Sequence, residues 1–172
     1  MGAPVAVEER GIELTTSSPA ETLTMARAFA GPCRPGDVVG LCGTLGAGKT
    51  LFVKGLAAGL GVADVRQVVS PTFVLMRSYP ARLTLYHFDA YRLASEAEMD
   101  AVGCQETFAS GGVSAIEWAD HVAGCLPPEH LMLSICVEGE TRRRFTLECH
   151  GAGSAWRVAE FGAALARWRV SP

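Results

Sequence analysis

The stretch Gly43-Thr44-Leu45-Gly46-Ala47-Gly48-Lys49-Thr50 decides the fold of this chain. It fits the pattern G-x-x-x-x-G-K-[ST], which is that of a phosphate-binding P-loop. The uncharged apolar run at 38–42 precedes it and predicts a strand buried on both faces. Residues 49–60 after it predict a helix. A glycine turn that binds nothing is the alternative, but a strand, a loop and a helix in this order favour a nucleotide site.

The residue types of the loop suit a nucleoside triphosphate. Glycines let successive backbone N–H groups turn inward without a Cβ in the way, and the helix that begins at Lys49 adds the positive end of its dipole. We expect Lys49 to reach the β- and γ-phosphates and to be exposed beside them rather than packed. The Thr50 hydroxyl should coordinate Mg²⁺.

Strands and helices alternate along the rest of the chain, which predicts an α/β layered domain. Capping boxes at Ser18 and Ser95 predict helices that run to about residues 30 and 102. A terminal helix is predicted at 154–168, with Trp156, Phe161, Leu165 and Trp168 in the core. Further strands are expected at 12–15, 73–79, 83–88, 113–116, 131–137 and 142–149, with hairpins at 80–82 and 138–141. We therefore expect a P-loop NTPase three-layer sandwich with a mixed, centrally parallel sheet and helices on both faces, formed by residues 1–172 as one domain.

The composition excludes several classes of protein. Of 172 residues, 49% are hydrophobic and 19% are charged, which argues against disorder and a coiled coil. No uncharged run reaches the roughly 18 residues of a membrane-spanning helix, and residues 1–10 lack the features of a secretory signal. The net charge of −3 argues against strong independent binding of nucleic acid. Six cysteines without a CxxC pair predict buried thiols in a reducing compartment rather than a zinc knuckle.

Two acidic residues, Asp89 and Glu117, each end a predicted strand. They should lie on the rim where ligands bind in open α/β sheets, beside the phosphates. Alone, either acid is better explained as a turn or cap residue, but the P-loop in the same chain favours a role at the phosphates. Within its strand, His87 is either a packed, hydrogen-bonded histidine or a proton carrier. The segment Ser70-Pro71-Thr72 is either an ordinary proline turn or a loop that senses the γ-phosphate.

Four motifs in this order resemble the TsaE (YjeE) family: the P-loop, Ser70-Pro71-Thr72-Phe73, Tyr86-His87-Phe88-Asp89-Ala90-Tyr91-Arg92 and Ile116-Glu117-Trp118. The resemblance covers most of the chain, from Ser18 to Arg142. Members of this family are bacterial P-loop ATPases required for threonylcarbamoyladenosine modification of tRNA. The resemblance implies a cytoplasmic, Mg²⁺-dependent ATPase that docks on the TsaD–TsaB heterodimer and resets it by hydrolysing ATP. Contact with tRNA would then be indirect.

The family's functional residues carry over onto matching positions. The resemblance implies catalytic roles for Lys49, Asp89 and Glu117, and contact with Mg²⁺ or its water for Thr50, Asp89 and Glu117. An arginine of the run 142–144 either reaches the nucleotide or is simply solvated. The implied nucleotide-binding residues are Gly43, Thr44, Leu45, Gly46, Ala47, Gly48, Lys49, Thr50, Leu51, Thr72, Trp118 and Arg142.

Two departures from the family pattern stand in the P-loop. Thr44 replaces an acid, and Leu51 replaces a second threonine whose hydroxyl could contact the α-phosphate, so nucleotide affinity should be lower. The rival functions are a small-molecule kinase, with residues 142–144 as a lid, and a nucleotide-gated adaptor without useful turnover. A GTPase is disfavoured because the Asn-Lys-x-Asp guanine motif requires asparagine, which this chain lacks.

Overall fold

The computed structural model describes residues 11–170, so the prediction about a leader at residues 1–10 lies outside the described residues. Seven strands form one sheet in the order β1-β7-β6-β2-β5-β4-β3. The four central strands β6, β2, β5 and β4 are parallel, and the outer pairs are antiparallel. The predicted mixed, centrally parallel sheet is therefore confirmed. The strands are β1 (Gly11–Thr16), β2 (Val38–Cys42), β3 (Met76–Tyr79), β4 (Leu85–Asp89), β5 (Val113–Glu117), β6 (Leu131–Val137) and β7 (Arg143–Cys149).

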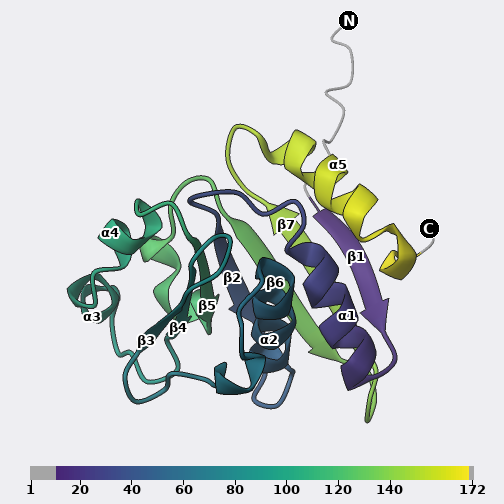
Figure 1. The fold of residues 1–172 in the computed structure, drawn as a ribbon, viewed down its shortest axis with the longest axis horizontal. Coiled ribbons are helices and arrows are strands. Elements are labelled where there is room, and N and C mark those ends of the chain that lie inside the picture. Colours follow the sequence, from purple (N-terminus) through teal and green to yellow (C-terminus); the bar gives the residue numbers. More distant parts are fainter. Residues whose placement is uncertain (1–10, 171–172) are drawn as a thin grey trace, which may run out of the picture.

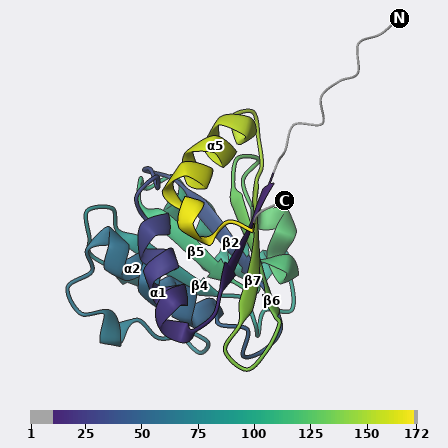
Figure 2. The same ribbon diagram turned by 90° about the vertical axis from the view of Figure 1, so that its right-hand side faces the viewer.

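Helices cover both faces of the sheet (Figures 1 and 2). On one face, α1, α2 and α5 enclose a core that includes Val39 and Leu41 of β2. On the other, α3, α4 and a 3₁₀ segment pack over Val38 and Ile116. This is the expected three-layer sandwich. The helices are α1 (Pro19–Phe29), α2 (Lys49–Leu60), α3 (Glu96–Ala101), α4 (Cys104–Phe108) and α5 (Ser154–Ala164), with 3₁₀ segments at Val65–Gln67, Ala119–Cys125 and Ala166–Trp168.

The local signals at the helix starts are confirmed. The Ser18 side chain accepts a hydrogen bond from the backbone N–H of Glu21, and Pro19 occupies the first turn of α1. The Ser95 side chain caps α3 in the same way. Such caps satisfy N–H groups that have no partner inside the helix. None of the helices in residues 11–170 has the length and apolar character required to cross a membrane.

Two local predictions were wrong. Residues 73–75 form a turn ahead of β3 instead of the start of the strand, and the Phe73 side chain is 82% exposed. The predicted core residue Trp156 is 53% exposed, with the Arg34 guanidinium 3.8 Å from its ring centroid. In both cases an apolar residue at plausible spacing lies at the surface, where an arginine rather than the core packs against its ring. Phe161, Leu165 and Trp168 are buried as predicted.

Candidate functional site

The P-loop connects the end of β2 to the start of α2. Gly43 has φ 148° and Gly48 has φ 109°, conformations that side chains with a Cβ rarely adopt. A Cβ on Gly43 would also lie 2.7 Å from the Ile135 carbonyl oxygen. No side chain caps the N-terminus of α2, and no acidic residue lies in its first turn. Its backbone N–H groups therefore remain suited to an anion, as the motif predicts.

Lys49 is buried, with a relative exposure of 5%, which corrects the expectation that it would lie exposed. Its Nζ donates hydrogen bonds to the carbonyl oxygens of Gly43, at 2.6 Å, and Thr44, at 3.0 Å. The ammonium group of Lys49 thus links two backbone carbonyls of the loop. Burial lowers the pKa of Lys49, while the nearby carboxylates of Glu117 and other acids act in the opposite direction.

Trp118 forms the other wall around the Lys49 ammonium. The Nζ atom lies 3.5 Å from the centroid of its ring, a cation–π contact. The Tyr91 ring lies 5.0 Å from that of Trp118 and extends the aromatic surface. Trp118 has φ 60°, an unusual conformation for a bulky residue. Such strain concentrates at functional sites, and here it turns the indole toward the P-loop lysine.

Glu117 is buried and joins three elements of the site. The Thr50 hydroxyl on α2 donates to its Oε1 at 2.8 Å and lies 3.0 Å from Oε2. The Nε2 atom of His87 on β4 lies 2.8 Å from Oε1 and donates when it carries the proton. His87 is fully buried, so its interpretation as a packed, hydrogen-bonded residue is confirmed. Glu117 caps no helix, because the 3₁₀ segment after it has no side-chain cap.

Asp89 stands beside Glu117, at the paired position of the neighbouring parallel strand. Its Oδ2 accepts hydrogen bonds from the hydroxyls of Ser70 and Thr72, the latter at 2.8 Å. Its Oδ1 accepts from the backbone N–H of Tyr91 at 2.9 Å. The acid thus ties the loop that holds Ser70 and Thr72 to the end of β4. Asp89 and Glu117 therefore lie next to each other at the carboxyl ends of the parallel strands, as their positions in the sequence predicted.

A cavity of about 420 Å³ opens between these groups. Most of the site residues predicted from the sequence line this cavity. Ser70 and Tyr91 also line it; they were not predicted as site residues, although both lie in motifs shared with the TsaE family. Its size falls in the range of typical ligand sites. The lining comprises Leu45, Gly46, Gly48, Lys49, Thr50, Leu51, Ser70, Thr72, Asp89, Tyr91, Glu117 and Trp118.

Four predicted residues lie outside this lining. Gly43 and Thr44 contribute the carbonyls that hold Lys49. Ala47 is buried, and its carbonyl accepts a 2.9 Å hydrogen bond from Nε of Arg143. Arg142 instead pairs with Glu138 on its own hairpin, at 3.1 Å. Within the arginine run it is therefore Arg143 that contacts the P-loop, a distinction that three consecutive arginines do not reveal.

Comparison with known proteins shows the family. A family model described as threonylcarbamoyl adenosine biosynthesis protein TsaE matches residues 16–145. The chain belongs to the TsaE family. The family is involved in the biosynthesis of threonylcarbamoyladenosine in tRNA, and the predicted resemblance is confirmed.

Relatives of this TsaE-family chain match over most of their length. The tRNA threonylcarbamoyladenosine biosynthesis protein TsaE of Treponema pallidum is 47% identical over 112 residues, which cover 65% of this chain and 82% of that protein. The protein of the same name from Bacillus subtilis is 42% identical over 137 residues, covering 79% and 84%. The crystal structure of Bacillus subtilis YdiB aligns with a TM-score of 0.73 and 34% identity, covering 91% of this chain and 95% of that one. The P-loop fold of this family is thus shared.

Proposed function

We propose that this TsaE-family protein binds and hydrolyses ATP with Mg²⁺ and supports the TsaD–TsaB complex in the threonylcarbamoyladenosine modification of tRNA. It would act in the cytoplasm, and tRNA would be contacted through the complex. The observation that carries the proposal is the convergence of an uncapped P-loop helix, Lys49 and two buried acids, Asp89 and Glu117, on one cavity. An anion and a metal ion are the ligands that such a set of groups fits.

Magnesium fits the donors on the acidic side of the cavity. Thr50, Asp89 and Glu117 offer hydroxyl and carboxylate oxygens, which are hard ligands that Mg²⁺ prefers. Within residues 11–170, no lysine or arginine forms an ion pair with either acid. Buried carboxylates are normally paired or bound to metal. When bound, Mg²⁺ would neutralise charge on the phosphates.

The residues that line the cavity would each have a separate role in binding and hydrolysis. The N–H groups at the start of α2 would bind phosphate oxygens, and Lys49 would exchange its carbonyl partners for them. Glu117, released from Thr50, would help to place the metal and the attacking water. Asp89 would hold the Ser70–Thr72 loop against the cavity through its two hydroxyl contacts. Trp118 and Tyr91 would shield the phosphates from solvent, which strengthens these interactions.

Exposed apolar side chains beside the cavity support the proposal that another protein binds there. Leu45 in the P-loop is 79% exposed, and Phe73 and Val74, which follow Thr72, are 82% and 56% exposed. Such side chains on loops at a nucleotide site can report its state to a bound protein.

The small-molecule kinase is the less favoured alternative. Its lid would need mobile arginines, whereas Arg142 and Arg144 both pair with Glu138 and Arg143 bonds to the P-loop. The adaptor without useful turnover differs from the proposal only in the hydrolysis step.

Single-turnover hydrolysis of ATP, with and without the TsaD–TsaB pair, tests the proposal. We expect turnover that requires Mg²⁺, needs no small acceptor and accelerates with the pair. Transfer of phosphate to a small acceptor would establish the kinase. Tight binding of ATP without hydrolysis, even with the pair, would establish the adaptor.

A further inference from the structure

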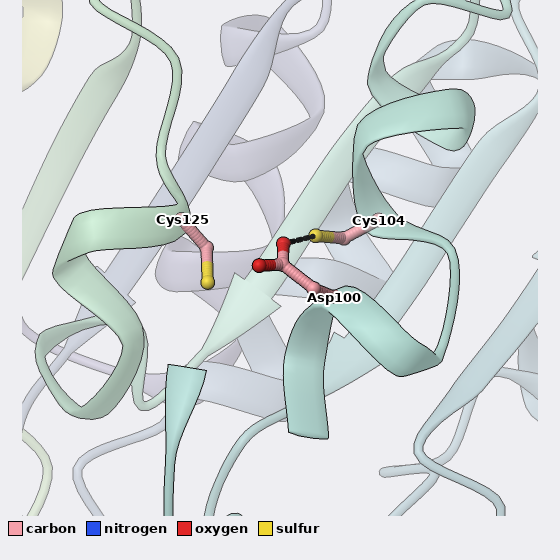
Figure 3. Close-up of side chains that lie close together, drawn as sticks. All are labelled: Asp100, Cys104 and Cys125. Carbon is pink, nitrogen blue, oxygen red and sulfur yellow. Dashed lines mark hydrogen bonds between the residues drawn. The ribbon is translucent and has the colours of Figure 1, made fainter. Parts of the chain in front are cut away.

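A second cluster of chemically reactive side chains lies away from the P-loop. Asp100 on α3, Cys104 at the start of α4 and Cys125 at the end of the 3₁₀ segment place their ligand atoms within 4.8 Å of one another. Figure 3 shows the Asp100 carboxylate pointing into the space between the two thiols. Among residues 11–170, no other three His, Cys, Asp or Glu side chains gather so closely.

The burial of the cluster resembles that of a site open on one side. Both cysteines are buried, with 0% and 4% exposure, whereas Asp100 is exposed. Cys104 donates from Sγ to Asp100 Oδ1 at 3.4 Å, and Cys125 donates from Sγ to the backbone carbonyl of Glu96 at 3.4 Å. Burial raises the pKa of the Cys104 thiol to about 12, and it also raises the pKa of Cys125.

Gln105 fastens the two halves of the cluster together. Its side-chain Nε2 lies 3.7 Å from Cys104 Sγ and donates to the Cys125 carbonyl at 3.0 Å. Donors of this kind around sulfur ligands orient them and stabilise the thiolate form in metal sites. Gln105 thus links the Cys104 side chain to the backbone of Cys125.

We propose that Asp100, Cys104 and Cys125 bind a zinc ion. Two thiolates and one carboxylate are ligands that Zn²⁺ accepts, with a fourth position left for water on the exposed side. A tetrahedral zinc about 2.3 Å from each sulfur separates two sulfurs by about 3.8 Å, so shifts of about 1 Å suffice. Each thiol loses its proton to solvent as its sulfur binds the ion. Soft sulfur ligands select zinc over the magnesium that suits the P-loop rim.

The position of the cluster gives the ion a structural consequence. The chain reaches α3 after leaving Asp89, and it reaches Cys125 after leaving Glu117 and Trp118. Zinc would therefore bridge the two segments that continue from the rim acids, and it would fix them relative to each other. Zinc binding at this cluster requires no particular reaction at the P-loop.

Cobalt titration of the fully reduced protein tests the site, with excess Mg²⁺ present to occupy the oxygen ligands of the rim. We expect one equivalent of Co²⁺ to produce a thiolate-to-cobalt charge-transfer band, which one equivalent of Zn²⁺ then removes. Cys104→Ser should abolish the band. Asp100→Asn changes an exposed residue, is expected to fold normally and should weaken binding roughly tenfold or more.

Cys136→Ser is the matched control, because Cys136 is exposed and lies outside the cluster. It should leave the band unchanged. The proposal is wrong if one equivalent of Co²⁺ gives no band, or if the band survives Cys104→Ser.

Discussion

The two ends of the parallel strands hold their acids in different ways: Asp37 at one end is half-buried, whereas Asp89 and Glu117 at the other are buried. At the start of β2, Asp37 accepts from the Arg34 backbone N–H at 2.8 Å and from the Arg157 guanidinium. Burial raises the pKa of Asp37, and these two donors oppose the rise. At the far end, Asp89 and Glu117 have hydroxyl, backbone N–H and histidine partners instead, although both are 3% exposed.

This difference is the basis on which we assign Asp37 a structural role and propose functional roles for Asp89 and Glu117. Asp37 has its cation within the fold, so it needs no ligand. The rim acids are buried without an arginine or lysine partner, and their hydroxyl partners are themselves ligands suited to a metal. Because no lysine or arginine neutralises the rim acids, a metal ion is the partner that we propose for them.

The largest effect that follows from this comparison is expected for Glu117→Gln. The amide keeps the shape and the Thr50 contact but removes the negative charge. Single-turnover hydrolysis should slow on the order of 100-fold or more, roughly 2.7 kcal/mol or above, with a much smaller change in ATP affinity.

Asp37→Asn is the matched control at the opposite end of the strands, and it should leave hydrolysis unchanged. Equal losses in both variants would remove the distinction between the two acids.

Lys49→Ala should weaken ATP binding roughly 10- to 100-fold, because charge-assisted hydrogen bonds to phosphate are lost. Since Lys49 also bonds two loop carbonyls, the free energy of unfolding should fall by about 1–3 kcal/mol. Calorimetric titration and urea unfolding measure the two effects. Lys54→Ala, on the same helix but outside the cavity lining, should retain the parent's affinity, and matching losses in both variants would contradict the role of Lys49.

Arg157→Ala should affect stability alone. Its side chain is 13% exposed and pairs with Asp37 and Glu160, so both carboxylates would lose a partner. The free energy of unfolding, measured in urea, should fall by about 1–3 kcal/mol. Under conditions where the variant is folded, a large loss of ATP turnover would show that this end of the sheet also serves the reaction.

The smallest effect is expected for Arg142→Ala. Arg142 is exposed and paired with Glu138, and such surface pairs contribute little. We expect ATP affinity and stability close to those of the parent, whereas Arg143→Ala should lower ATP affinity a few-fold through the Ala47 carbonyl. A larger loss of ATP affinity in Arg142→Ala than in Arg143→Ala would show that Arg142 contacts the nucleotide.

The sequence predicted the fold and most of the cavity because those features follow from local patterns. The P-loop glycines, the capping serines and the strand-ending acids each specify a conformation or a place on the rim. The sequence did not predict contacts that depend on long-range packing. The burial of Lys49 depends on Trp118, and the exposure of Trp156 depends on which helix face lacks a neighbour. Likewise, the meeting of Cys104 and Cys125, 21 positions apart, depends on the packing of α3 and α4 against the 3₁₀ segment.

The magnesium dependence of ATP binding tests the central claim most directly. The claim is that Asp89 and Glu117 bind Mg²⁺, whereas Asp37 is already paired with Arg157. Calorimetric titrations with ATP, with and without Mg²⁺, would compare the parent with Asp89→Asn, Glu117→Gln and Asp37→Asn. The account predicts that Mg²⁺ strengthens binding in the parent and in Asp37→Asn, and that this gain is reduced in both rim variants. An undiminished gain in Asp89→Asn and Glu117→Gln would contradict it.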